Sequence, residues 1–242
     1  MGFKVRGYTR DISLEKVRDY SLFAIATEGT EREPDYFRLF DGIDRIKVDI
    51  IEPETSDDQE EVSENRTASS PSKVLEKVKA YINKNQLSAE DGDSLWCVID
   101  VDRWPQEQIN ELYAFCAQKD NWHLVISNPC IEIWLLYHKK SDLTGLGIQS
   151  AKDAKQALNK IENGGYYYIK YLPLMLQAIK NAQQTDSNPD GYMPELLETK
   201  VYQLGHALYE RMGKVRFEKF IASLPSIEKS LLKYKTNIKK KR

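Results

Sequence analysis

The feature that most constrains the fold is an apolar run at residues 94–99 that ends on two carboxylates, Asp100 and Asp102, one residue apart. A short, nearly continuous apolar segment is typical of a strand buried on both faces of a sheet. A second apolar run, residues 22–26, is followed closely by Glu28. Both patterns predict central strands that carry acidic side chains to one end of a sheet.

Strands and helices are predicted to alternate along the first 140 residues. Residues 45–50 alternate apolar and polar, which predicts a strand with one wet face near a sheet edge. The order strand, helix, strand, helix predicts an α/β fold, a mainly parallel four-stranded sheet flanked by helices. The expected strands cover 22–26, 45–50, 94–100 and 122–126, and the expected helices begin near Pro34, Ser70-Pro71, Trp104-Pro105 and residue 130.

Beyond residue 139 the pattern is helical, without a convincing strand. We therefore divide the chain into residues 1–140, which hold the sheet, and residues 141–242, a helical subdomain with a basic C-terminal tail. The expected helices cover 150–161, 169–183, 194–211 and 214–235.

The net charge of −2 hides a segregation of charge. Residues 49–64 hold eight acids and no Lys or Arg, and residues 52–71, acidic and rich in serine, are expected to form a mobile loop. Residues 229–242 hold seven basic residues and no acid. Such a tail either attracts phosphates or is a solvated terminus.

Composition favours a soluble globular protein in the cytoplasm. A chain of 242 residues with 41% hydrophobic content can bury a proper core. It has no stretch of about 18 apolar residues and no charged leader before an apolar segment, so neither a membrane span nor secretion is expected. Cys97, Cys116 and Cys130 lack metal-ligand spacing and are expected to be reduced packing residues.

The acids after the central strands predict a metal site. In open parallel sheets ligands gather outside the carboxyl ends of the strands, where Glu28, Asp100 and Asp102 would all lie. Period-two spacing turns the two aspartates to the same side, and Mg²⁺ (or Mn²⁺) prefers a few carboxylates with waters and phosphates. Crowding would raise the pKa of Glu28 and suit it to acid–base work. The alternative is that these acids start turns or cap helices.

Glu132 lies in the otherwise apolar segment 130–138, where a carboxylate is costly unless it is paired or bound to metal. It is either a further metal ligand or acid near Asp100, or a glutamate that faces solvent or pairs with arginine. Asn128 is a candidate substrate contact, with helix capping as the alternative. His138 is expected to interact with a helix dipole rather than act as a base.

Residues 166–171 combine four tyrosines with Lys170. Nucleic-acid binders use such groups to stack bases and to hold a phosphate, which makes Lys170 a candidate substrate-binding residue. The alternative is that the tyrosines pack the interface with the helical subdomain.

Three ordered blocks of sequence together resemble the RloB-like family, and their order and spacing match across residues 22–138. The similarity continues more weakly through residues 168–170 and 199–204. The blocks are Thr27-Glu28-Gly29 with Thr30-Glu31 and Tyr36-Phe37, then Trp96-Cys97-Val98-Ile99-Asp100-Val101-Asp102, and then Ser127-Asn128-Pro129-Cys130 with Glu132, Trp134 and His138.

Proteins of that family occur with bacterial anti-phage systems, including type I restriction loci, and look like members of the Toprim superfamily. Toprim domains carry a glutamate after the first strand and Asp-x-Asp after a later one, which Glu28, Asp100 and Asp102 match. The resemblance implies a Toprim-like catalytic domain over residues 1–140. The third acid of an extended Asp-x-Asp-x-Asp form falls on Trp104, so a second metal ion would need Glu132 or another donor.

We therefore expect a nuclease of bacterial anti-phage defence that uses Mg²⁺ or Mn²⁺ to cleave RNA, such as tRNA, or DNA. Asp100 and Asp102 would hold the metal ion, and Glu28 would handle the proton. The alternatives are a non-catalytic nucleic-acid or nucleotide-binding regulatory subunit of a defence system, and a nucleotidyl-transfer enzyme. A partner protein from the same defence system and assembly into an oligomer are both compatible with this function.

Overall fold

The computed structural model describes residues 20–29, 32–43, 45–52, 70–101, 104–162 and 167–240. Most of the loop expected over residues 52–71 and the last two residues of the basic tail lie outside this part of the chain.

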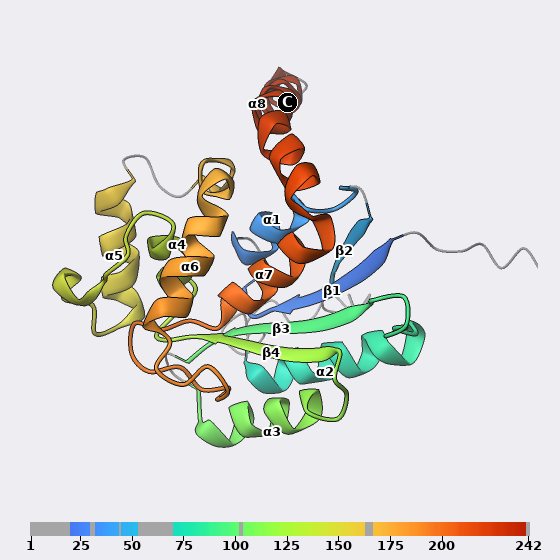
Figure 1. The fold of residues 1–242 in the computed structure, drawn as a ribbon, viewed down its shortest axis with the longest axis vertical. Helices are drawn as coiled ribbons and strands as arrows, with labels where there is room; N and C mark the ends of the chain where they lie inside the picture. The colour runs from blue at the N-terminus through green and yellow to red at the C-terminus, as the bar shows by residue number, and fades with distance from the viewer. Residues whose placement is uncertain are drawn as a thin grey trace, which may run out of the picture.

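A four-stranded, all-parallel sheet forms the centre of the molecule (Figure 1). Its strands are β1 (Ser21–Thr27), β2 (Ile46–Ile50), β3 (Ser94–Asp100) and β4 (Trp122–Ser127), in the order β2-β1-β3-β4. β1 is buried along its whole length and β3 is buried up to Asp100, whereas β2 alternates between buried and exposed positions at its start. The α/β fold, the two central strands and the edge position of residues 45–50 are therefore confirmed.

Helices cover both faces of the sheet (Figure 1). The chain folds into α1 (Arg32–Arg38), α2 (Pro71–Lys84), α3 (Gln106–Cys116), α4 (Glu132–Tyr137), α5 (Ala151–Ile161), α6 (Met175–Thr185), α7 (Val201–Met212) and α8 (Lys214–Lys240), with short 3-10 turns η1 (Thr144–Leu146), η2 (Tyr168–Lys170) and η3 (Leu172–Leu174). α2 and α3 pack on one face, and α1, α4 and α7 pack on the other.

The two faces follow from the period of the strands. In β1, Phe23 and Ile25 enter the apolar cluster formed with α1, α4 and α7, whereas Ala24 and Ala26 enter the cluster formed with α2 and α3. The first cluster continues without a break through α5 and α6 as far as Leu224 of α8. The helices of the second half therefore share a core with the sheet.

Local signals explain several element boundaries. Pro71 is the first residue of α2, and Ser70 caps the helix by accepting a hydrogen bond from the Lys73 N–H (3.3 Å), as the Ser-Pro pair predicts. The three cysteines are buried free thiols, which fits their expected packing role.

The structure corrects the helix expected over residues 194–211. α7 begins only at Val201, because the residues before it pair with the edge of β4. Thr199 forms an antiparallel bridge with Ser127, and the Lys200 N–H donates to the Ile126 carbonyl (2.7 Å). The second half of the chain was expected to lack strand structure. Thr199 nevertheless extends the sheet by one short bridge.

Two other helices differ in extent from their predicted bounds. The segment expected as one helix over 169–183 starts as the turns η2 and η3 and becomes α-helical at Met175, since Pro173 lies inside η3. The last helix continues past residue 235 to Lys240. Among the residues that the structure describes, no helix combines the length and apolarity needed to span a bilayer.

Candidate acidic site at the carboxyl end of the sheet

Glu28 and Asp100 meet where β1 and β3 end. The backbone N–H of Asp100 donates a hydrogen bond to Glu28 Oε2 (3.1 Å), across 72 residues of sequence. The Glu28 N–H in turn donates to the Val98 carbonyl (3.1 Å), which continues the parallel ladder beyond the end of β1. Both acids are half-buried. Two of the three predicted acids are thus brought together, and the third, Asp102, lies outside the described residues.

A cation from α2 lies beside this pair. Lys77 Nζ donates a hydrogen bond to the Thr27 carbonyl, one residue before Glu28. Burial lowers the pKa of Lys77, and the negative charges of Glu28 and Glu33 act in the opposite direction. Lys77 therefore shares the end of β1 with two carboxylates.

Glu33 also belongs to this neighbourhood, since its charge acts on Lys77. Its carboxylate lies against Gly29, where a Cβ atom would fall 2.2 Å from Glu33 Oε2. Sequence reasoning missed Lys77. The signal that could have found it is its place between Val74 and Val78, in the stripe of α2 that packs against the sheet.

Glu132 is buried, with 2% of its surface exposed, so the solvent-facing alternative is wrong. It lies in the first turn of α4. Burial raises the pKa of the Cys130 thiol, and the nearby charges of Glu132 and Asp100 raise it further. Glu132 therefore contacts Cys130, and the charges of Glu132 and Asp100 act on the same thiol.

Asn128 anchors the segment that precedes α7. Its side-chain amide donates to the Pro194 carbonyl (3.0 Å), and its backbone N–H donates to the Glu198 carbonyl (3.0 Å). Its own carbonyl accepts from the Leu197 N–H (2.9 Å). The N-cap residue of α4 is Ile131, so the capping role considered for Asn128 is wrong. Its substrate role stays a prediction.

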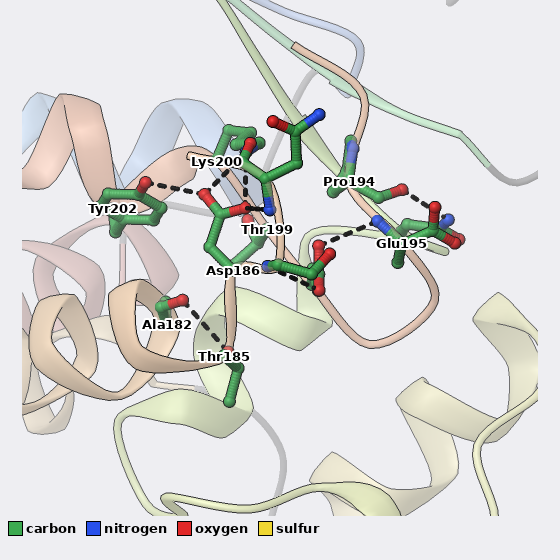
Figure 2. A network of polar contacts seen from close by, with 12 residues as sticks. Ala182, Thr185, Asp186, Pro194, Glu195, Thr199, Lys200 and Tyr202 are labelled. Atoms are coloured by element: carbon green, nitrogen blue, oxygen red, sulfur yellow. Dashed lines mark hydrogen bonds and ion pairs between the residues drawn. The ribbon is translucent and has the colours of Figure 1, made fainter. Parts of the chain in front are cut away.

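A buried ion pair fixes the same segment (Figure 2). Lys200 Nζ donates to both carboxylate oxygens of Asp186 (2.6 Å each) and to the Asn188 carbonyl (2.6 Å). Tyr202 O–H donates to Asp186 Oδ2 (2.8 Å). The side chains of Lys200 and Asp186 are only 1% and 0% exposed, so the pair is fully desolvated and depends on these hydrogen bonds.

The loop over residues 186–200 also reaches α3, which lies on the face of the sheet opposite to α7. Tyr192 stacks on Tyr113 of α3, with ring centroids 3.9 Å apart and planes inclined by 16°. The Tyr192 O–H donates to Asn110 Oδ1 (2.6 Å). Because the other end of the loop bonds to β4, the loop connects both faces beside the carboxyl end of β4.

The tyrosines of residues 167–171 pack against the core, which is the alternative to nucleic-acid binding considered for this segment. Tyr171 is buried, and Tyr167 and Tyr168 pack partly buried against the core. Lys170 Nζ pairs with Glu162 Oε1 (3.4 Å). These contacts tie Lys170 to the helical subdomain, and among the described residues no contact joins it to Glu28 or Asp100.

His138 is a buried core residue. Its Nδ1 lies 3.0 Å from the Trp134 carbonyl and its Nε2 lies 3.1 Å from Tyr36 Oη. A carbonyl only accepts, so Nδ1 carries the proton and Nε2 accepts from tyrosine. Burial lowers the pKa of His138 to about 3, which keeps the ring neutral. His138 is the C-cap residue of α4, and its hydrogen bond to the Trp134 carbonyl fits the expected role at the helix end rather than that of a base.

The donors at the strand ends suit a hard divalent cation in their chemistry. Glu28 and Asp100 supply carboxylate oxygens, the ligands that Mg²⁺ takes together with water and phosphate oxygens. Within the described ranges, no three His, Cys, Asp or Glu side chains are grouped to hold a metal ion. Asp102, the predicted third ligand, lies outside these ranges.

The fold and this site define an α/β protein with an acidic centre at the carboxyl end of a parallel sheet. A comparison with known protein families matches residues 23–208 to RloB-like proteins. This span is more than half of the chain, so the protein belongs to the RloB-like family, as the sequence blocks indicated. Neither the curated proteins nor the solved structures yielded a match.

Proposed function

We propose that this protein is a metal-dependent nuclease that cleaves phosphodiesters in RNA, such as tRNA, or in DNA. The observation that carries the proposal is the hydrogen bond from the Asp100 N–H to the Glu28 carboxylate. It supports the proposal because the Glu28 carboxylate meets the backbone of the residue that carries a second acid, at the end of a parallel sheet where α/β proteins bind ligands. A carboxylate there could act in proton transfer.

Each acid has a proposed role. Asp100 and Asp102 would hold Mg²⁺ or Mn²⁺, and buried Glu132 would be a further ligand or would support Asp100. The bound ion would lower the pKa of a water molecule and offset the charge of the phosphate. Glu28 would accept the proton of the attacking water as its oxygen bonds to phosphorus. The bond from phosphorus to the leaving sugar oxygen then breaks, and that oxygen takes up a proton.

Two further residues are proposed to contact the substrate. Asn128 lies at the end of β4, next to the strand that carries Asp100, and is proposed to touch substrate there. Lys170 is exposed and is proposed to hold a more distant phosphate. We also propose that the protein acts in bacterial anti-phage defence, in the cytoplasm, with a partner protein of the same system, and the support for the defence setting is the resemblance of the three sequence blocks to the RloB-like family.

The test is to incubate the purified protein with labelled RNA and DNA in Mg²⁺, Mn²⁺ or EDTA. We expect cleavage that requires metal and falls at least about a hundredfold in Asp100→Ala and in Glu28→Gln. Glu111→Gln, an exposed acid on α3, is the control and should cleave like the wild type. Cleavage that persists in both variants would show that other residues carry out the reaction.

A regulatory subunit is the second candidate. The same arrangement of Glu28, Asp100 and Lys77 at the end of the sheet would serve such a subunit as a binding site. Such a protein would keep the fold and bind a nucleotide or nucleic acid without cutting it. Tight binding with no cleavage in either metal would support this alternative.

A further inference from the structure

We propose that Lys77 is the cation of the acidic site and that its ammonium group contacts the phosphate that is cleaved. This inference rests on the proposed function and deepens it, since it assigns a substrate contact to a residue of α2. It concerns the described neighbours Thr27, Glu28 and Glu33.

The position of Lys77 follows from the packing of α2. Val74, Leu75 and Val78 hold the helix against the sheet, and Lys77 lies next to this buried stripe, half-buried. Its aliphatic chain therefore runs along the end of β1, and its Nζ atom reaches the Thr27 carbonyl. The ammonium group is fixed at the edge of the sheet where Glu28 is held.

The hydrogen bond to the Thr27 carbonyl does not neutralise the positive charge of Lys77. A carbonyl takes one of the three N–H donors and carries no net charge. Glu28 and Glu33 lie within electrostatic reach but form no ion pair within 4 Å with it among the described residues. Two donors and most of the positive charge are thus left for an anion that binds at the same edge.

A phosphodiester that binds at this edge brings negative charge, which a fixed ammonium group can share with a metal ion. A fixed ammonium group supplies positive charge without further carboxylates, and in a partly desolvated site it stabilises a phosphate strongly. Before substrate binds, the same charge repels a divalent cation at Glu28.

These two effects have opposite signs and can be measured separately. We would compare the wild type with Lys77→Met, which keeps the length of the side chain, and with Lys77→Arg, which keeps its charge. Lys79→Met, two residues along α2 and positioned over the Phe115 ring, is the matched control. The readouts are Mn²⁺ affinity without nucleic acid, cleavage rate in saturating Mn²⁺, and melting temperature.

Lys77→Met is expected to bind Mn²⁺ about tenfold more tightly and to cleave about a hundredfold more slowly. Lys77→Arg should stay within about threefold of the wild type in Mn²⁺ affinity, because it retains the charge. Lys79→Met should match the wild type in both. Unchanged Mn²⁺ affinity and rate in Lys77→Met would overturn the proposal. A joint loss of metal binding, cleavage rate and melting temperature would also overturn it, because that combination is expected if Lys77 only stabilises the fold.

A wild-type protein that does not cleave would refute the nuclease function without deciding the role of Lys77. The Mn²⁺ measurement would then be combined with the affinity for an uncut oligonucleotide. Tighter Mn²⁺ binding with about tenfold weaker oligonucleotide binding in Lys77→Met would support the assignment. Equal oligonucleotide affinity in Lys77→Met and Lys79→Met would refute it.

Discussion

The Glu28 carboxylate is oriented by the backbone of the neighbouring strand. Because Asp100 donates its own N–H to Glu28, the position of one acid depends on the chain that carries the other. Their proximity was predictable from the sequence, since both follow buried strands of a parallel sheet. The approach of Lys77 was not predictable in the same way, because it depends on how α2 is rotated against the sheet.

His138 gives a prediction about acid stability. Its pKa is lowered to about 3 in the folded protein by burial, from an ordinary value of 6.5. Only the unfolded chain takes up this proton between those values, so the stabilisation is complete above pH 6.5 and is lost as the pH falls. We expect His138 to reduce the free energy of unfolding by about 1.4 kcal/mol per pH unit between pH 6 and 4.

Denaturant unfolding at pH 7, 6, 5 and 4 checks this, with His138→Gln as the comparison. The variant is less stable at pH 7, but its stability should fall less steeply with acid. Equal slopes for the two proteins would contradict the prediction.

At the scale of elements, strands and capped helices were predictable and the loop over residues 186–200 was not. Buried strands have a clear apolar pattern, and Ser70-Pro71 marks a helix start through local chemistry. The bridge between Ser127 and Thr199 joins residues that are 72 apart in the sequence, and no periodic pattern predicts such a contact. Helical spacing in 194–211 therefore extended the predicted helix too far.

The buried pair in this loop yields a prediction on stability. Lys200→Met leaves the Asp186 carboxylate desolvated without its cation, and we expect a loss of about 3–5 kcal/mol in the free energy of unfolding. Denaturant unfolding measures the loss. The control is Lys214→Met, whose partner Glu218 lies 4.0 Å away in an exposed pair, and there we expect less than about 0.5 kcal/mol. A small effect at Lys200 would show that the pair does not hold the loop.

At the scale of the whole molecule, the division at residue 140 does not separate two cores. Val201, Leu204 and Leu208 of α7 belong to the same apolar cluster as Phe23 and Ile25 of β1. The sequence could show where strands end and helices take over, but it could not show that the later helices return to cover the sheet. That return is a property of long-range packing.

A deletion series tests this shared core. A fragment of residues 1–140 lacks the apolar face of α7, so we expect it to be aggregated or to lack cooperative unfolding. A fragment of residues 1–228 keeps all of the apolar side chains described in the shared cluster and should unfold cooperatively near the melting temperature of the full chain. Circular dichroism during thermal unfolding distinguishes them. A cooperative 1–140 fragment would show that the sheet folds on its own.

The proposed function requires a divalent cation at the carboxyl end of the sheet, bound by Asp100 and Asp102 beside Glu28. A crystal structure of the protein soaked in Mn²⁺, with an anomalous difference map, tests it most directly. We expect a single strong peak within about 2.0–2.4 Å of oxygens from Asp100 and from at least one of the other two acids. A clear map with no peak at these carboxylates, or with manganese bound only elsewhere, would contradict it.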